Sequence, residues 1–437
     1  MVVGRRTIMA AGINEFLEKY KLLVDVSEYK EECSRFIYEM TLGLAYKDRG
    51  LPMVHTYISD EGKIPIGEKI VVVDAGGTNL RVATVHFDEQ LTPIISNYNR
   101  YSMPGVTSEI SADELFTQIA ELLIPYLINC NKVGICFSYM SESTVDRDAK
   151  VVELSKEVKV RDIKGRMVCR EIAKVLESRG ITGKRFTLVN DSVATLLAGK
   201  ITSNTSDEHI GYILGTGQNI CYSEKIENIL RLEMENTNIS SMIINVESGY
   251  YNRYDRGSLD VKLDEESENT SSHILEKMMS GAYLGNITLR VLKAAASEGL
   301  LSREAKKRLN ELQELPLVYV DEYYSDSHSS NIFAQCFSFG ETDITVSRSL
   351  IDAVMRRAAY LNAVVIGATL KKAEAGMNNE NPCVICIDGT TFYKTLWLKQ
   401  HIDELFKTLI EEGLQRKFIT VKVEDAPLIG TAVAGLT

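Results

Sequence analysis

Apolar positions along the chain form short runs broken by glycine turns, and longer stretches with helical spacing. The run that begins at Ile70 passes through Asp74-Ala-Gly-Gly-Thr and continues to Phe87, which predicts a hairpin turning at Gly76 and Gly77. The elements expected next are a strand over 93–101, a helix over 112–128 with Ser111 as its N-cap, and a strand over 133–137.

A second set of elements follows the same order. A strand over 186–189 precedes a helix over 191–200, and a hairpin is expected where 210–214 and 219–222 flank Gly215-Thr216-Gly217. Two strand–glycine–strand units, each followed by helices, predict two α/β halves with a cleft between them. The other expected elements are the helical segment 13–46, the strand 241–246, the helices 272–296 and 347–373, the strand 383–387, the small-residue segment 426–436, and surface loops at 203–208 and 263–271.

The composition is typical of a globular protein. The chain has 437 residues, of which 45% are apolar and 25% charged, and this excludes disorder over most of its length. Such a length favours two to three domains. The formal charge is −11 at pH 7, whereas a nucleic-acid-binding surface carries a basic surplus, so we expect no nucleic-acid partner.

The sequence contains few patterns typical of membrane spans, redox sites or metal sites. No apolar run approaches the ~18 residues of a membrane span, and the N-terminus has no secretory stretch. Of the eight cysteines, only Cys383 and Cys386 have the spacing of a metal or redox pair, but in a strand positions i and i+3 face opposite sides. We therefore expect buried, reduced thiols and a cytoplasmic protein without a membrane partner.

The two glycine turns are the first candidates for chemistry. Their backbone N–H groups can approach an anion closely, and Asp74, at a strand end, could hold a metal-bound water. Either turn alone is better explained as a plain hairpin. Two of them, one in each half, favour a pair that clamps phosphates from both sides of a cleft.

Asn190-Asp191 is the next candidate, because it follows an apolar strand and opens a helix. A carboxylate there could accept a proton from a substrate hydroxyl, or it could only cap the helix. The helix N-terminus is expected to lower the pKa of this acid. The other polar residues near the ends of apolar runs could together bind sugar hydroxyls, although each alone reads as solvated surface: Ser138, Lys156, Asn219, Glu247 and Glu276.

In this order, the segments resemble the hexokinase family, from about Phe36 to the end of the chain. The segment around Glu276, Leu275-Glu-Lys-Met-Met-Ser-Gly-Ala-Tyr-Leu-Gly285, is the most specific match. The others are Phe36–Leu44, Leu51–Tyr57, Asp74–Val82, Leu188–Thr195, Leu214–Tyr222 and Ile387–Lys394.

The resemblance implies a two-domain actin-like (ribonuclease H-like) ATPase fold of the α/β class, with a cleft between the domains. The small domain would span 62–191, and the large domain 1–61 plus 192–437, with a C-terminal helix at about 427–437 packing on the small domain. Asp191 would be the base, and the sugar would contact Ser138, Ser155, Lys156, Asn190, Asp191, Asn219, Glu247 and Glu276. Asp74 would position magnesium through water, and ATP would lie against Asp74, Gly76, Gly77, Thr78, Asn79, Arg81, Gly215, Thr216, Gly389 and Thr390.

The resulting prediction is an ATP- and Mg²⁺-dependent hexokinase, active as a monomer or homodimer, that phosphorylates the 6-hydroxyl of a hexose, with D-glucose expected. The family's Phe-Ser-Phe-Pro loop is Phe-Ser-Tyr-Met here (137–140), and its Thr-Lys-Gly-Phe stretch is Ser-Lys-Glu-Val (155–158). Losing the proline should loosen the first loop. These departures leave two alternatives open: a sugar sensor with weakened catalysis, or a kinase of mannose, fructose or an amino sugar.

Overall fold

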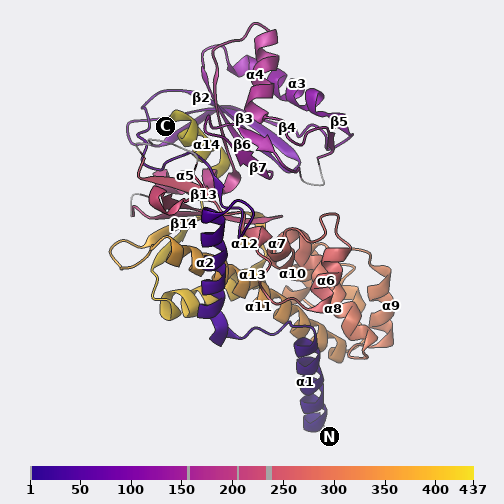
Figure 1. Cartoon of the computed structure of the whole chain (residues 1–437). Helices are drawn as coiled ribbons and strands as arrows, with labels where there is room; N and C mark the ends of the chain where they lie inside the picture. The colour runs from indigo at the N-terminus through magenta and orange to yellow at the C-terminus, as the bar shows by residue number, and fades with distance from the viewer. Residues whose placement is uncertain (1, 155–157, 204–205, 233–238) are drawn as a thin grey trace.

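A computed structural model describes residues 2–154, 158–203, 206–232 and 239–437, with side chains described from residue 11 onward. Two main sheets, each covered by helices, form two halves stacked one above the other, and helix α1 (Val2–Lys19) projects from the lower half (Figure 1). This arrangement confirms the predicted class of two α/β halves.

The upper half contains a five-stranded sheet in the order β10-β6-β2-β3-β4. Strands β2, β3 and β4 pair antiparallel, and β6 lies parallel to both β2 and β10. Alternate residues of β2 serve opposite faces: Val71 and Val73 pack on the side of helices α3 and α4, and Ile70 and Val72 on the side of α5 and α14. The strands are β2 Ile70–Gly76, β3 Asn79–Phe87, β4 Pro93–Ser102, β6 Lys132–Phe137 and β10 Arg185–Val189; the helices are α3 Ala112–Leu123, α4 Val168–Ser178, α5 Asp191–Thr202 and α14 Ala426–Leu436.

The lower half contains a six-stranded sheet in the order β1-β13-β12-β11-β14-β15. Strands β11, β12 and β13 form an antiparallel meander, and β14 and β15 continue in parallel beside β11, so the arrangement of the upper sheet is repeated. The strands are β1 Val54–His55, β11 His209–Leu214, β12 Gln218–Lys225, β13 Ser241–Asn245, β14 Cys383–Asp388 and β15 Phe418–Val421.

Helices account for most of the remaining chain. The long helix α11 contributes a row of fully buried residues to the core of the lower half. The helices are α2 Tyr29–Ala45, α6 Ser258–Glu265, α7 Ile274–Met279, α8 Gly281–Ser297, α9 Arg303–Glu311, α10 Leu317–Ser325, α11 Glu341–Lys372, α12 Thr390–Lys394 and α13 Leu396–Leu405; two short strand pairs are β5 Ile110–Ser111 with β9 Val160–Arg161, and β7 Ser141–Ser143 with β8 Ala149–Val151.

Three sequence-based expectations need correction. The helical segment 13–46 is two helices, because the chain takes a left-handed conformation at Lys21 and Asp25 then accepts the N–H of Ser27 ahead of α2. The helix 272–296 is broken at the extended residue Ser280. The stretch 263–271 is only partly a loop: helix α6 extends to Glu265, and several residues of the stretch line a cleft. The stretch 203–208 includes residues 204–205, which lie outside the described chain.

The last helix, α14, packs against β2, β6 and α5. The contact with α5 is so close that a Cβ atom at Gly430 would stand 1.7 Å from the carbonyl oxygen of Ala194. The chain therefore returns, at its end, to the sheet formed by its first strands. The domain boundaries stay a prediction.

Candidate active site

A cleft of about 1320 Å³ is lined by residues from both halves of the molecule. It gathers every predicted site residue that lies in the described part of the chain, and Ser155 and Lys156 lie outside that part. The gathered residues are Asp74, Gly76, Gly77, Thr78, Asn79, Arg81, Ser138, Asn190, Asp191, Gly215, Thr216, Asn219, Glu247, Glu276, Gly389 and Thr390.

The turn between β2 and β3 forms one wall. Gly77 has a φ of 52°, a conformation that glycine adopts at little cost, and Tyr139 Oη donates a 3.1 Å hydrogen bond to its carbonyl oxygen. Asp74 lies on β2, is 5% exposed, and accepts a 2.6 Å bond from Nε of Arg81 on β3. Burial raises the pKa of Asp74, and the guanidinium beside it opposes that rise.

Asp191 is the first residue of helix α5, and Asn190 is the N-cap. Oδ1 of Asp191 and Oδ1 of Asn190 accept the N–H of Ser192 at 2.9 and 3.0 Å. The expectation that the helix N-terminus lowers the pKa of Asp191 is wrong. Burial raises it to about 6, which outweighs the bond from Ser192, and the nearby carboxylates of Asp388 and Asp74 act in the same direction as burial.

Amide and carboxyl side chains form a connected network beside Asp191. Asn245, 4% exposed at the end of β13, accepts a 2.8 Å bond from Nδ2 of Asn219 and donates a 2.7 Å bond to Oε1 of Glu247. Nδ2 of Asn219 also lies 3.4 Å from Oδ1 of Asn190. The pKa of Glu247 rises to about 7 because of burial, against the bond from Asn245.

Glu276 enters the cleft from helix α7. Its Oε2 accepts a 2.9 Å bond from the backbone N–H of Gln218, directly after the second glycine turn. Burial raises its pKa to about 7, and the bond from Gln218 opposes the shift. This part of the cleft thus presents the carboxyl groups of Asp191, Glu247 and Glu276 and the amides of Asn190 and Asn219, which can accept from and donate to several hydroxyls of one ligand.

The second glycine turn explains the broken helix. The N–H groups of Gly281 and Ala282, which open α8, donate to the carbonyl oxygens of Gly215 and Thr216 at 2.9 and 3.1 Å. A Cβ atom at Gly281 would stand 2.8 Å from the Gly215 oxygen. Gly389 faces the same turn with a φ of 122°, and a Cβ atom there would stand 2.3 Å from Leu214.

Sequence reasoning missed some residues of the cleft. Asp388 ends β14 and lies within electrostatic reach of Asp74 and Asp191, and its position directly after an apolar run was the same signal that pointed to Asp74. Asn245 also follows an apolar run. His273 lines the cleft with its ring 4.1 Å from that of Tyr250, and no pattern in the sequence indicates this pairing.

Two models of the hexokinase family together match most of the sequence. Residues 13–201 match one hexokinase family model, and residues 209–437 match a second. Hexokinase-1 of Schizosaccharomyces pombe is 26% identical over 420 residues, covering 91% of this chain and 85% of its own. Glucokinase-1 of Kluyveromyces lactis is 27% identical over 417 residues, covering 85% of each chain.

A solved structure has the same fold. The hexokinase from Schistosoma mansoni complexed with glucose superposes with a TM-score of 0.81 at 24% identity, covering 98% of this chain and 99% of its own. The two-domain, actin-like fold is shared with solved hexokinases, and the family models assign the chain to the class of sugar kinases. The chain belongs to the hexokinase family and is an ATP-dependent hexose kinase, a phosphotransferase with an alcohol acceptor.

Two further findings concern partners and redox chemistry. Within the described ranges, no helix combines the length and the apolar character that crossing a bilayer requires. All eight cysteines are buried and free, including Cys383 and Cys386 on β14. This confirms the expectation of buried core thiols.

Proposed function

We propose that the protein transfers the γ-phosphoryl group of ATP to the 6-hydroxyl of D-glucose, with Asp191 as the general base. The observation that carries this proposal is the position of the Asp191 carboxylate, which lies beside amide and carboxyl groups suited to sugar hydroxyls and lines the same cleft as the two glycine turns. A carboxyl with a pKa of about 6 is ionised at neutral pH and can still accept a proton effectively.

Glucose would bind through Ser138, Ser155, Lys156, Asn190, Asn219, Glu247 and Glu276, together with Asp191. The Asn219–Asn245–Glu247 chain of hydrogen bonds fixes the direction in which each amide faces, so the site is oriented before the sugar arrives. Burial raises the pKa of Glu247 and Glu276 to about 7, so both would be partly ionised at neutral pH and could accept bonds from, or donate bonds to, neighbouring hydroxyls.

The glycine turns would hold the phosphates of ATP from both halves: Gly76, Gly77, Thr78, Asn79 and Arg81 on one side, Gly215 and Thr216 on the other, with Gly389 and Thr390 near the nucleoside. Asp74 and Asp388 fit a magnesium ion held through water, because Mg²⁺ takes one or two carboxylates and keeps several waters. When bound, the ion would neutralise phosphate charge. No cage of three or more His, Cys, Asp or Glu occurs among the described residues, which suits this indirect mode.

Domain closure on the sugar would exclude water from this site. Water is a competing nucleophile, so a kinase that stayed open would hydrolyse ATP. The alternatives are a sensor with weakened catalysis or a kinase of mannose, fructose or an amino sugar, because the loop Phe137-Ser-Tyr-Met140 departs from the family's pattern. Location in the cytoplasm and a monomeric or homodimeric state stay predictions.

The test is ADP release, measured by a coupled assay with ATP, magnesium and a panel of hexoses, with a no-sugar control. We expect release with glucose in the wild type, and a loss of kcat of roughly 10²–10⁴-fold in Asp191→Ala with glucose binding retained in calorimetry. Asp255→Ala, at an exposed position, is the matched control and should behave as wild type. Near-full activity of Asp191→Ala would refute the proposed base, and binding without release in the wild type would favour the sensor.

A further inference from the structure

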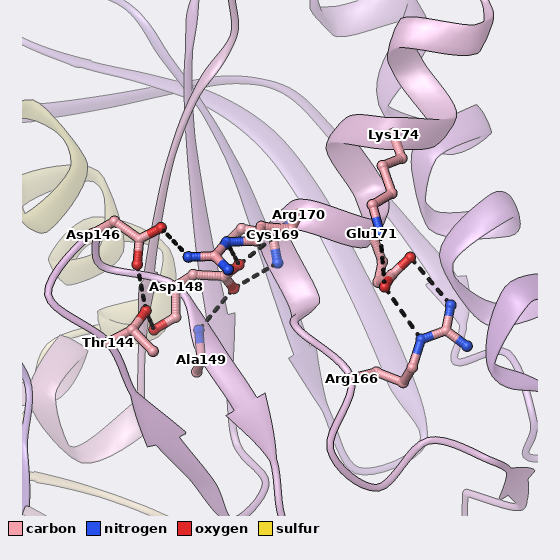
Figure 2. A network of polar contacts seen from close by, with 9 residues as sticks. All are labelled: Thr144, Asp146, Asp148, Ala149, Arg166, Cys169, Arg170, Glu171 and Lys174. Atoms are coloured by element: carbon pink, nitrogen blue, oxygen red, sulfur yellow. Dashed lines mark hydrogen bonds and ion pairs between the residues drawn. The ribbon is translucent and has the colours of Figure 1, made fainter.

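Asp148, outside the cleft, is a buried carboxylate that ties two segments together. It is 2% exposed and lies directly before strand β8, in the turn of the β7–β8 hairpin. Oδ1 accepts the N–H groups of Ala149 and Cys169 at 2.7 Å each, and Oδ2 accepts that of Arg170 at 3.0 Å. Figure 2 shows its side chain directed at the first turn of helix α4.

Helix α4 needs this carboxylate, because its own N-cap residue cannot supply one. The N-cap is Met167, which makes no side-chain capping bond. Cys169 and Arg170 occupy the second and third helical positions, whose N–H groups an N-cap side chain normally accepts. Asp148 takes both donors from a different segment, so the cap of α4 is also a connection between α4 and the hairpin.

The base of the β7–β8 hairpin, which is the end opposite its turn, lies at the cleft. Val152 and Glu153 donate their N–H groups to the carbonyl oxygen of Met140 at 2.9 and 3.2 Å. Met140 and Glu153 both line the cleft, as does Ser138. From the base of the hairpin the chain leads back to Ser138, one of the predicted sugar-contacting residues.

The turn of the hairpin has further attachments. The carbonyl oxygen of Arg147 accepts a 2.8 Å bond from the N–H of Leu188 on β10, the strand that leads to Asp191. Nη1 of Arg147 lies 3.4 Å from the carbonyl oxygen of Ala434 on α14. Asp146, whose side chain is 54% exposed, forms an ion pair with Arg170 at 2.9 Å, and this pair is open to solvent.

We propose that Asp148 is a positioning residue for the hexose: it fixes the β7–β8 hairpin on helix α4 and thereby sets the place of the loop that carries Ser138 and Met140. This inference rests on the proposed function. The loop 137–140 contains no proline that would restrict its backbone, so the buried carboxylate of Asp148 supplies part of its rigidity. Its loss should weaken hexose binding and leave the phosphate side of the cleft intact.

The first experiment compares Asp148→Ala and Asp148→Asn with wild type. For Asp148→Ala we expect the KM for glucose to rise about tenfold, with kcat and the KM for ATP changed less than about twofold, which is the signature of lost binding that the ground state and the transition state share. Asp148→Asn keeps one acceptor oxygen, so its KM for glucose should lie between the values of wild type and Asp148→Ala. Asp146→Ala, which removes a carboxylate two residues away with no bond to the backbone of α4, is the matched control and should leave the KM unchanged.

The second experiment separates positioning from helix capping. Met167→Asp in the Asp148→Ala background gives α4 an N-cap of its own without restoring the tie to the hairpin. We expect the double variant to regain thermal stability and amide protection at Cys169 and Arg170, while its KM for glucose stays raised and the amides of Val152 and Glu153 exchange faster than in wild type. A double variant that regains the wild-type KM and the wild-type exchange of Val152 and Glu153 would show that Asp148 only caps α4 and would overturn the proposal.

These experiments distinguish a failure of the proposed function from a failure of the role proposed for Asp148. A wild type that phosphorylates no hexose refutes the function, and the exchange of the Val152 and Glu153 amides still decides the role of Asp148. If Asp148→Ala does not fold, Asp148→Asn and the double variant carry the test. An unchanged KM together with unchanged exchange in these variants would overturn the inference.

Discussion

Oε2 of Glu276 lies so close to the backbone of Gly217 that a Cβ atom at position 217 would stand 2.7 Å from it. The same oxygen accepts the N–H of Gln218, the next residue. The second glycine turn therefore limits where the carboxyl group of Glu276, a proposed sugar-binding group, can lie.

Gly217→Ala should displace Glu276 and weaken hexose binding. Because the clash is with a carboxyl oxygen whose bond to the N–H of Gln218 limits its movement, we expect the KM for glucose to rise about tenfold with a smaller change in kcat. The measurement is steady-state kinetics with glucose varied. Gly340→Ala is the control, since no atom lies within 4 Å of a Cβ there and its φ of 176° suits any residue. Equal KM values in wild type and Gly217→Ala would contradict the prediction.

The acidic limb of the pH profile should reflect Asp191. The base must be ionised, and burial raises its pKa to about 6, so kcat/KM should fall as the pH drops below about 6 to 7, with Glu247 and Glu276 contributing to the same limb. Asp388→Asn removes a negative charge that raises the pKa of Asp191, so its limb should move to lower pH, whatever the loss in kcat. A limb that stays in place would show that another group controls it.

Glu247→Gln should stabilise the sugar-free protein at high pH. The pKa of Glu247 is about 7 in the fold because of burial, against an ordinary value of 4.5. Between pH 4.5 and pH 7 the folded state binds more protons than the unfolded state, so the free energy of unfolding falls as the pH rises. Above about pH 7 Glu247 is ionised in both states, and its destabilising effect on the fold is complete. The amide mimics the protonated acid, and we expect a gain of about 1–2 kcal/mol at pH 8 and little change at pH 4 in denaturant titrations. A gain that is equal at both pH values would contradict this account.

Arg81→Ala should destabilise the upper half. It leaves the buried carboxylate of Asp74 without its cation, which typically costs about 3 kcal/mol, and it should raise the pKa of Asp74 further. Adding Asp74→Asn removes the buried carboxylate that has lost its partner, so the double variant should recover most of the lost stability, measured by thermal unfolding. Asp425→Asn serves as the control: its bond to Arg81 is 3.3 Å long and its side chain is 42% exposed, so it should cost less than about 1 kcal/mol.

The sequence predicted features whose causes are local. The hairpin at Gly76 and Gly77 and the helix that Ser111 caps depend on neighbouring residues, and the structure contains both. The break at Ser280 depends on bonds from Gly281 to Gly215, far away in the chain, and helical spacing carries no trace of them. The predicted direction of the pKa shift at Asp191 was wrong for a similar reason. The helix N-terminus can be recognised in the sequence, but the burial that outweighs its effect arises only in the folded protein.

The position of helix α14 has a consequence for how the chain is made. Helix α14, which covers one face of the β2–β6 sheet, is translated long after the strands that it covers. Until α14 has been made, Ile70, Val72 and their neighbours lack part of their apolar cover, and exposed apolar sheet surface favours aggregation. The upper half is therefore completed late in synthesis, and a nascent chain cut short before residue 426 should depend on chaperones even though most of its sheet is already present.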